Sequence, residues 1–165
     1  MLHSQKGFTL IELLIAIAIL GILASVAAIN IRYAMAKNDL TTATNQLAVD
    51  IRAMQQLSTE KAIDDTSGTI NITFSSNSYQ IITDKATNTG FSVHSLPSTI
   101  TLTSSSGTIL TFNPNNLTNN AAAMITLTSN TLPKDEKVQT IIISRTTGRI
   151  RIDTSAKPAY RKEEI

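Results

Sequence analysis

Side chains able to carry out chemistry are few in this 165-residue chain, and no familiar catalytic pattern is present. The two histidines, His3 and His94, stand far apart in the sequence, and there is no cysteine. No HExxH, CxxC, GxSxG, Walker or GxGxxG motif occurs, so the sequence offers neither a nucleophile with its base nor a set of metal ligands. We therefore expect that the chain is not an enzyme and that it binds no cofactor. A membrane-anchored enzyme would need an activity that these residues do not suggest.

Basic residues near the C-terminus are the first group with a definite binding chemistry. Between residues 145 and 162 there are six basic side chains against the single acid Asp153: Arg145, Arg149, Arg151, Lys157, Arg161 and Lys162. Two β-rich runs, 138–145 and 149–153, flank Thr146-Thr147-Gly148, where a glycine suits the positive φ that a short hairpin loop demands. The pattern predicts a basic β-hairpin.

Alternation along the second run decides where these charges point. Arg149 and Arg151 share one face of the predicted strand, and Ile150 and Ile152 share the other. If the isoleucines are buried, both guanidinium groups face solvent beside Arg145 across the turn, which suits the phosphate oxygens of a nucleic acid. The alternative is that charges on the wet face of an edge hairpin only keep the sheet soluble and deter edge pairing.

At the other end of the chain, residues 7–29 read GFTLIELLIAIAILGILASVAAI, an apolar run with few polar side chains. As a helix rising about 1.5 Å per residue, this run is long enough to cross a hydrocarbon layer roughly 30 Å thick. Glu12 is the one charge within it, and a carboxylate near the bilayer centre costs roughly 2.5 to 3.5 kcal/mol. Two interpretations stay open: an ordinary signal anchor that tolerates one acid near its end, or an acid that meets a cation of another subunit.

The start of the chain resembles the prepilin signature of type IV pilins and type II secretion pseudopilins, here Lys6-Gly7-Phe8-Thr9-Leu10-Ile11-Glu12-Leu13-Leu14. The resemblance implies that a membrane-embedded prepilin peptidase cuts between Gly7 and Phe8 and then methylates the new amine of Phe8. It also implies that Glu12 pairs with the N-terminal amine of a neighbouring subunit as the helices stack into a filament. Such a pair is attractive in low dielectric, where a missing partner is expensive.

Beyond the apolar run, the pattern predicts more helix and then strands. Residues 30–63 contain no Pro or Gly, and apolar residues recur every three or four positions, at Leu40, Ala43, Leu47, Ile51, Met54 and Leu57. After an Asp64–Gly68 turn, residues 69–74 alternate strictly, and seven further short β-rich runs follow: 79–83, 91–94, 99–103, 108–112, 124–128, 138–145 and 149–153. We expect one helix from about Phe8 to Ile63, packed on a head of antiparallel sheets joined by hairpins. This is an α+β, pilin-like fold.

The overall plan is similar to that of the minor pseudopilin H of type II secretion and of the related FimT-like minor pilins. In the FimT-like branch a GRxR motif near the C-terminus binds DNA during uptake, and Gly148-Arg149-Ile150-Arg151 matches it position for position. The resemblance implies a structural minor pilin or pseudopilin of the H type. The alternative is a FimT-like subunit that captures double-stranded DNA through Arg149 and Arg151, with help from Arg145.

These expectations divide the chain into a leader (1–7), a transmembrane and assembly helix (8–29), an amphipathic helix (30–63), a β-rich head (64–155) and a charged tail (156–165). The resemblance implies a single pass through the bacterial cytoplasmic (inner) membrane with an exported head, and a place at or near the tip of a pilus or pseudopilus. The expected partners are other pilin or pseudopilin subunits, the prepilin peptidase, the inner membrane and, in the alternative, double-stranded DNA.

Overall fold

The computed structural model describes residues 8–61, 70–84, 89–112, 123–144, 147–155 and 158. The chain divides into two compact units, residues 1–35 and residues 36–165. Several sequence predictions concern residues outside the described ones: the leader with Gly7, the predicted helix end at Ile63, the Asp64–Gly68 turn, Arg145 and nearly all of the tail.

One long helix, α1, spans Leu10–Lys61, close to the predicted extent. Thr9 sets its start, because the N–H of Glu12 donates to Thr9 Oγ1 at 3.3 Å and the N–H of Thr9 donates to Glu12 Oε2 at 3.5 Å. This reciprocal pair is a capping box, which satisfies two of the backbone donors that a helix start leaves unpaired. The carboxylate of Glu12 therefore has a local structural role that the hydrophobicity of the segment alone did not suggest.

Apolar side chains cover the N-terminal unit on all sides of α1. Between residues 10 and 23 the large apolar side chains are exposed, from 50% at Leu14 to 83% at Leu10. When a helix has apolar side chains on every face, another apolar medium must cover them. By length and composition, this helix can cross a membrane.

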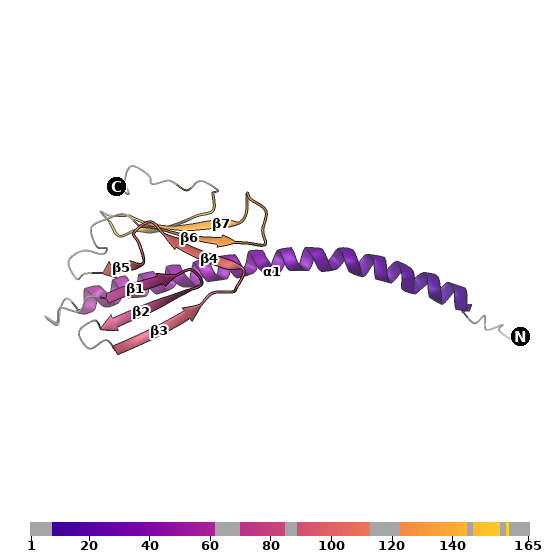
Figure 1. Ribbon diagram of the computed structural model, residues 1–165, viewed down its shortest axis with the longest axis horizontal. Coiled ribbons are helices and arrows are strands. Elements are labelled where there is room, and N and C mark those ends of the chain that lie inside the picture. Colours follow the sequence, from indigo (N-terminus) through magenta and orange to yellow (C-terminus); the bar gives the residue numbers. More distant parts are fainter. Residues whose placement is uncertain are drawn as a thin grey trace, which may run out of the picture. The chain divides into compact units, whose positions relative to one another are not determined.

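Two four-stranded antiparallel sheets accompany α1 in the second unit (Figure 1). Sheet A has the strand order β3-β2-β1-β5, and its strands are β1 (Ile70–Ser75), β2 (Ser78–Asp84), β3 (Thr89–Ser95) and β5 (Ile109–Phe112). Sheet B has the order β4-β6-β7-β8, and its strands are β4 (Ile100–Ser104), β6 (Ala123–Ser129), β7 (Val138–Ile143) and β8 (Ile150–Asp153). The α+β fold expected from the sequence, one long helix with antiparallel sheets, is confirmed.

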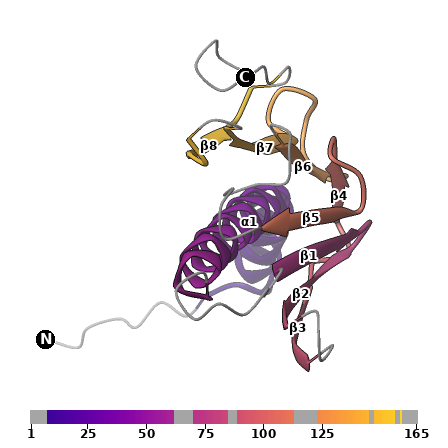
Figure 2. The same cartoon turned by 90° about the vertical axis from the view of Figure 1, so that its left-hand side faces the viewer.

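The core lies where α1 meets the two sheets. Seen along the helix, β1, β2 and β3 lie on one side of α1 and β6, β7 and β8 on another (Figure 2). Four of the six residues of the predicted apolar stripe face this core: Leu40, Leu47 and Ile51 are fully buried, and Met54 is nearly so. Ala43 and Leu57 are only half-buried. The helix is amphipathic here because only one face of it meets the sheets.

Strand alternation supplies the opposite side of the core. Ile70, Ile72 and Phe74 of β1 are buried, as their spacing predicted. Asn71 departs from the pattern: the alternation placed it on the solvated face, yet it is 8% exposed, and its Oδ1 has no hydrogen-bond partner among the described residues.

Hairpins join β1 to β2, β2 to β3, β6 to β7 and β7 to β8, but β4 and β5 follow a different path. These strands are consecutive in sequence, yet β4 pairs with β6 in sheet B and β5 pairs with β1 in sheet A. The prediction of antiparallel sheets joined by hairpins therefore holds for these four pairs and did not include the crossing of β4 and β5 between the sheets. Alternation in β4 and β5 is the same whichever sheet receives them, so the sequence pattern could not reveal the crossing.

Candidate functional site

The N-terminal site consists of Phe8 and the first turn of α1. Phe8 is 86% exposed, and the predicted cleavage partner Gly7 lies outside the described residues. Within the described part of the chain, Glu12 makes no ion pair, and the one hydrogen-bond donor to its carboxylate is the N–H of Thr9 in the capping box. The site therefore presents a carboxylate on an apolar, exposed helix surface. Where water is excluded, this carboxylate attracts a cation strongly.

The β7–β8 hairpin carries the C-terminal candidate site. Gly148 has φ 65°, the left-handed conformation predicted for a glycine in this loop. Its N–H donates to the carbonyl of Ser144 at 3.0 Å, and its own carbonyl accepts a 2.7 Å hydrogen bond from Nε2 of Gln55 on α1. The turn is thus held both within the hairpin and against the helix, a contact that the sequence did not suggest.

The two arginines of this hairpin differ in environment. Arg149 precedes β8 and is exposed, as predicted. Arg151 is only 19% exposed, and its Nη1 lies 2.9 Å from Oδ2 of Asp153. The expectation of two outward guanidinium groups over two buried isoleucines is therefore met only in part, since Ile150 and Ile152 are half-buried and Arg151 is paired. Arg145, the third predicted member, lies outside the described residues.

Hydrogen bonds fix the carboxylate of Asp153 in its ionised form. The backbone N–H of Ser155 donates to Asp153 Oδ1 at 2.9 Å, and Arg151 donates to Oδ2. These contacts, led by the hydrogen bonds from Ser155, lower the pKa of Asp153 below its ordinary value. The pair neutralises Arg151 locally, so Arg149 is the more available cation of the two.

A polar cluster that the sequence analysis missed lies between α1 and sheet A. The hydroxyl of Tyr79 donates to Asp50 Oδ2 at 2.6 Å, and the ring of His94 stacks on the ring of Tyr79 with centroids 4.9 Å apart and planes 2° apart. Gln46 donates to the other carboxylate oxygen of Asp50 at 3.0 Å. Burial of the phenol and the neighbouring carboxylate both raise the pKa of Tyr79.

The same cluster contains the residue types of a hydrolase triad without its geometry. Ser92 Oγ lies 2.7 Å from His94 Nε2, but Asp50 Oδ2 is 3.9 Å from His94 Nδ1 and is taken by the Tyr79 hydroxyl. An aspartate at that distance does not orient the imidazole. Within the described residues, no group of three His, Cys, Asp or Glu side chains could hold a metal ion.

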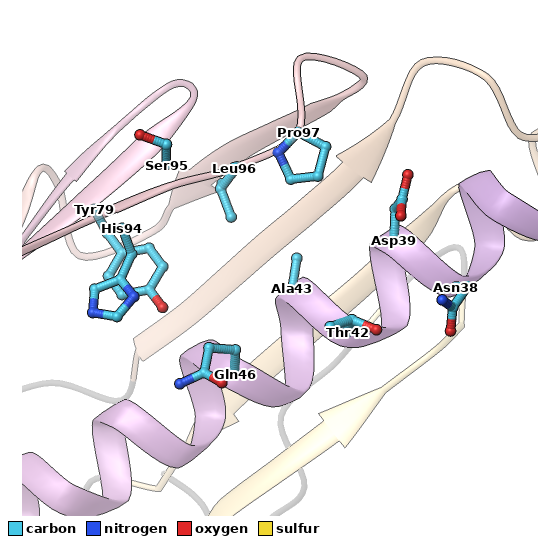
Figure 3. Close-up of a pocket in the computed structure, with 10 residues that line it drawn as sticks. All are labelled: Asn38, Asp39, Thr42, Ala43, Gln46, Tyr79, His94, Ser95, Leu96 and Pro97. Atoms are coloured by element: carbon cyan, nitrogen blue, oxygen red, sulfur yellow. The ribbon is translucent and has the colours of Figure 1, made fainter.

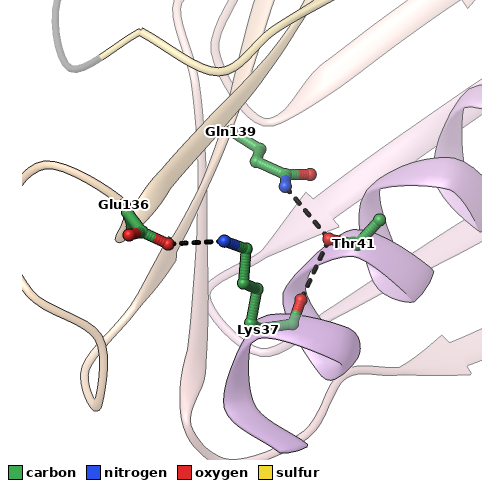
Figure 4. Close-up of polar contacts among 4 residues, drawn as sticks. All are labelled: Lys37, Thr41, Glu136 and Gln139. Carbon is green, nitrogen blue, oxygen red and sulfur yellow. Dashed lines mark hydrogen bonds and ion pairs between the residues drawn. The ribbon is translucent and has the colours of Figure 1, made fainter. Parts of the chain in front are cut away.

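Polar contacts on the other side of α1 tie it to sheet B (Figure 4). Lys37 Nζ lies 2.7 Å from Glu136 Oε2, and Gln139 of β7 donates to Thr41 Oγ1 at 3.2 Å. The Lys37–Glu136 pair is largely exposed, so its contribution to stability is small. These contacts position the head on the helix rather than form a site.

Comparison with known proteins adds to this picture. Residues 2–28 match the model of the prokaryotic N-terminal methylation motif. No curated protein sequence matches the chain significantly. Among solved structures, the chain is similar to the type IV minor pilin FimU of Pseudomonas aeruginosa (strain PAO1), with a TM-score of 0.51 and 22% sequence identity over 73% of this chain and 92% of that one. At that identity the similarity shows the fold alone.

Proposed function

We propose that this chain, which is type IV pilin-like in its N-terminal motif and its fold, is a minor pilin or pseudopilin subunit that assembles through its N-terminal helix. A prepilin peptidase cuts between Gly7 and Phe8 and methylates the amine of Phe8. Before assembly, the subunit lies in the bacterial inner membrane as a single-pass protein with its head exported. The observation that carries this proposal is the exposed apolar surface of α1 within the segment that matches the methylation motif.

Glu12 supplies the pairing that assembly needs. Alone in lipid, its charge is supported only by the capping box, and a carboxylate there costs roughly 2.5 to 3.5 kcal/mol near the bilayer centre. The amine of Phe8 on a neighbouring subunit is a cation that cleavage creates beside the same helix turn. Because a buried charge without its partner is strongly unfavourable, this pairing favours one register between subunits over others.

A comparison of Glu12→Ala with the parent chain in the native cell tests the proposal. We expect both to be cleaved after Gly7 and found in the membrane fraction, and we expect the variant to be depleted at least tenfold from sheared filaments, or from pseudopili that overexpression makes visible. Mass spectrometry of the N-terminus gives the cleavage and methylation state. Wild-type incorporation of the variant, or a mature chain that still begins at Met1, would count against the proposal.

We assign the subunit to the H type because its overall plan, a prepilin-like helix followed by a β-rich head with a late hairpin, resembles that of the H-type relatives described above. For an H-type subunit we also expect a position at or near the tip of the filament. Deleting the gene separates the two filament systems: loss of surface pili identifies a type IV pilus subunit, and retention of exported enzymes in the periplasm identifies a type II secretion pseudopilin.

Capture of double-stranded DNA is a second candidate function, favoured by the exposed position of Arg149 beside a firmly held turn. The pairing of Arg151 with Asp153 makes Arg149 the stronger candidate contact. Mobility-shift titrations of the full chain in detergent micelles test this function. We expect Arg149→Ala to weaken binding and lower the salt dependence by about one phosphate contact, Arg151→Ala to act less, and the exposed helical Arg52→Ala to have no effect. Equal behaviour of all three variants would remove this candidate.

A further inference from the structure

The edge of sheet A at β3 is open. Strand β3 has a neighbouring strand on one side only, and its seven residues include no Asp, Glu, Lys, Arg or Pro. Folded proteins commonly protect a sheet edge with charges, a short strand or a covering segment, because an open edge pairs readily with another chain. An edge of this length without such protection can accept a further strand.

The other three sheet edges each have some protection. β8, at one edge of sheet B, carries Arg151 and Asp153 within four residues. β5, at the far edge of sheet A, is only four residues long. At β4, the remaining edge, the N–H of Leu102 donates to the carbonyl of Ser76 at 2.8 Å. Among the strands that the structure describes, β3 is therefore the one that offers a long and uncharged edge.

Backbone alternation shows which groups β3 offers. The N–H of Leu96 donates to the carbonyl of Asn77 at 2.9 Å, and the Asn77 side chain donates to the carbonyl of Leu96 at 3.0 Å, so the backbone of Leu96 faces β2. Successive residues of an antiparallel strand turn their backbone groups to opposite sides. Ser95 and Val93 therefore point their N–H and C=O groups away from the sheet, and both side chains are exposed, Val93 by 65%. An added strand bonds to such groups.

A pocket of about 300 Å³ lies beside this edge, between β3 and α1 (Figure 3). One face of the His94 ring stacks on Tyr79 of β2, and because β3 is the edge strand, the other face is turned toward the position of an added strand. Leu96 and Pro97 line the pocket after β3, and Ala43 lines it from the helix. Every second side chain of a strand paired with β3 would point to this face of the sheet.

The pocket has an aromatic end and an acidic end. Figure 3 shows the His94 ring and Gln46 at one end and Asp39 at the other. Asp39 is half-buried and makes no hydrogen bond or ion pair in the part of the chain that the structure describes. Seven helical residues, about 10 Å, separate Asp39 from Gln46, and side chains on one face of a strand are about 6.6 Å apart. The pocket therefore suits two side chains: a large apolar one against the ring and a basic one at the carboxylate.

We propose that the β3 edge binds an extended segment of a different subunit. In that segment a large apolar residue packs on His94, and a lysine or arginine two positions away pairs with Asp39. This contact rests on the proposed function, because it requires that the chain meets other subunits in a filament.

A second copy of this chain does not supply such a segment. Among the described strands, only β8 carries a lysine or arginine, and that residue, Arg151, is paired with Asp153 at 2.9 Å. Pairing of two β3 edges would bring no cation and would place two Asp39 carboxylates along one seam. Because one edge accepts one strand of a different protein, the contact does not repeat along the filament, as a minor subunit requires.

Photo-cross-linking in the native cell tests the contact. A benzophenone amino acid replaces Ser95 on the edge or Thr42 on the helical side of the pocket, both of which are exposed. We expect adducts from both positions with one partner protein, mapped by mass spectrometry to a single segment in which a large apolar residue lies two positions from a lysine or arginine. Asp135, an exposed residue before β7, is the control position and should give no adduct with that segment. Adducts with a second copy, or with a segment that lacks this pattern, overturn the proposal.

Two substitutions then separate backbone pairing from side-chain fit. Val93→Pro removes an N–H that points out of the sheet, a position where an edge strand tolerates proline, and should lower the Ser95 adduct at least about fivefold. Asp39→Lys should lower it to a similar extent, and exchange of the mapped basic residue of the partner for glutamate should restore it. Asp135→Lys makes the same charge change outside the pocket and should have no effect.

An unchanged adduct yield in Asp39→Lys overturns the proposal, and this result does not depend on how well Val93→Pro folds. An unchanged yield in Val93→Pro, with a urea midpoint like that of the parent, overturns it as well. If the chain enters filaments in a Glu12-dependent way but Ser95 gives no adduct, the β3 contact is wrong and the proposed function stands. If Glu12→Ala enters filaments as well as the parent does, the proposed function fails whatever the adducts show.

Discussion

The hydroxyl of Tyr79 donates a 2.6 Å hydrogen bond to the carboxylate of Asp50, joining β2 of sheet A to the middle of α1. Asp50 is only 13% exposed, so this bond satisfies a charge that the fold has taken largely out of water. Gln46 donates to its second oxygen from the preceding helical turn. The contact therefore ties sheet A to the helix.

Removing this hydroxyl should destabilise the head measurably. A hydrogen bond to a charged group contributes about 1.5 to 3 kcal/mol, and Tyr79→Phe leaves Asp50 short of one donor. We expect a loss of that size in the free energy of unfolding, measured by urea titration in detergent micelles. Asp39→Asn is the matched control, because that carboxylate has no partner among the described residues and its change should stay within about 0.5 kcal/mol. Equal effects of the two substitutions would mean that the Tyr79–Asp50 hydrogen bond contributes nothing to the free energy of unfolding.

The same tyrosine should make the head sensitive to alkali. Burial, and then Asp50, raise the pKa of Tyr79 in the folded chain, whereas the unfolded phenol ionises near its ordinary value of about 10. The stabilisation is complete below about pH 10 and is lost as the pH rises towards the folded pKa, because only the unfolded state releases the proton. Urea midpoints of the parent should therefore fall as the pH rises above about 10, and those of Tyr79→Phe should fall less. Parallel curves for the two proteins would contradict this assignment.

The elements that could be predicted from the sequence are those with a local signature. The helical stripe and the alternation of β1 each repeat within a few residues, and these periods correctly predict burial of Leu40, Leu47 and Ile51 on α1 and of Ile70, Ile72 and Phe74 on β1. Asp50, Tyr79 and His94 share no spacing, and only the pairing of β2 with β3 against the helix brings them together. The Thr9–Glu12 capping box does have a local signature, a threonine three residues before a glutamate, but the apolar run around it predicts a membrane span and not a cap.

Gly148 is expected to resist substitution because of its backbone conformation. Its φ of 65° costs an ordinary side chain roughly 1 kcal/mol or more, and its N–H and C=O are both engaged in hydrogen bonds that hold the turn. We expect Gly148→Ala to lower the free energy of unfolding by at least that amount, and Gly148→Asn to lose less, since asparagine tolerates this conformation better. Chemical denaturation of both variants measures the difference. An alanine variant as stable as the parent would show that the turn relaxes at little cost.

The two roles of Glu12, capping its own helix and pairing with another subunit, can be separated by changing its capping partner. Thr9→Ala removes the hydroxyl that accepts from the Glu12 N–H but keeps the carboxylate, and the loss of an N-cap costs about 1 kcal/mol of helix stability. Glu12→Gln removes the charge but keeps a side chain able to accept from the Thr9 N–H, so the cap is largely preserved. If assembly depends on a cation from the neighbouring Phe8, Thr9→Ala should enter filaments nearly as well as the parent and Glu12→Gln should not. Quantitative immunoblots of sheared filaments, normalised to the membrane fraction, measure this contrast. The reverse order would mean that Glu12 acts by ordering the first turn of α1, and the intersubunit pairing would have to be abandoned.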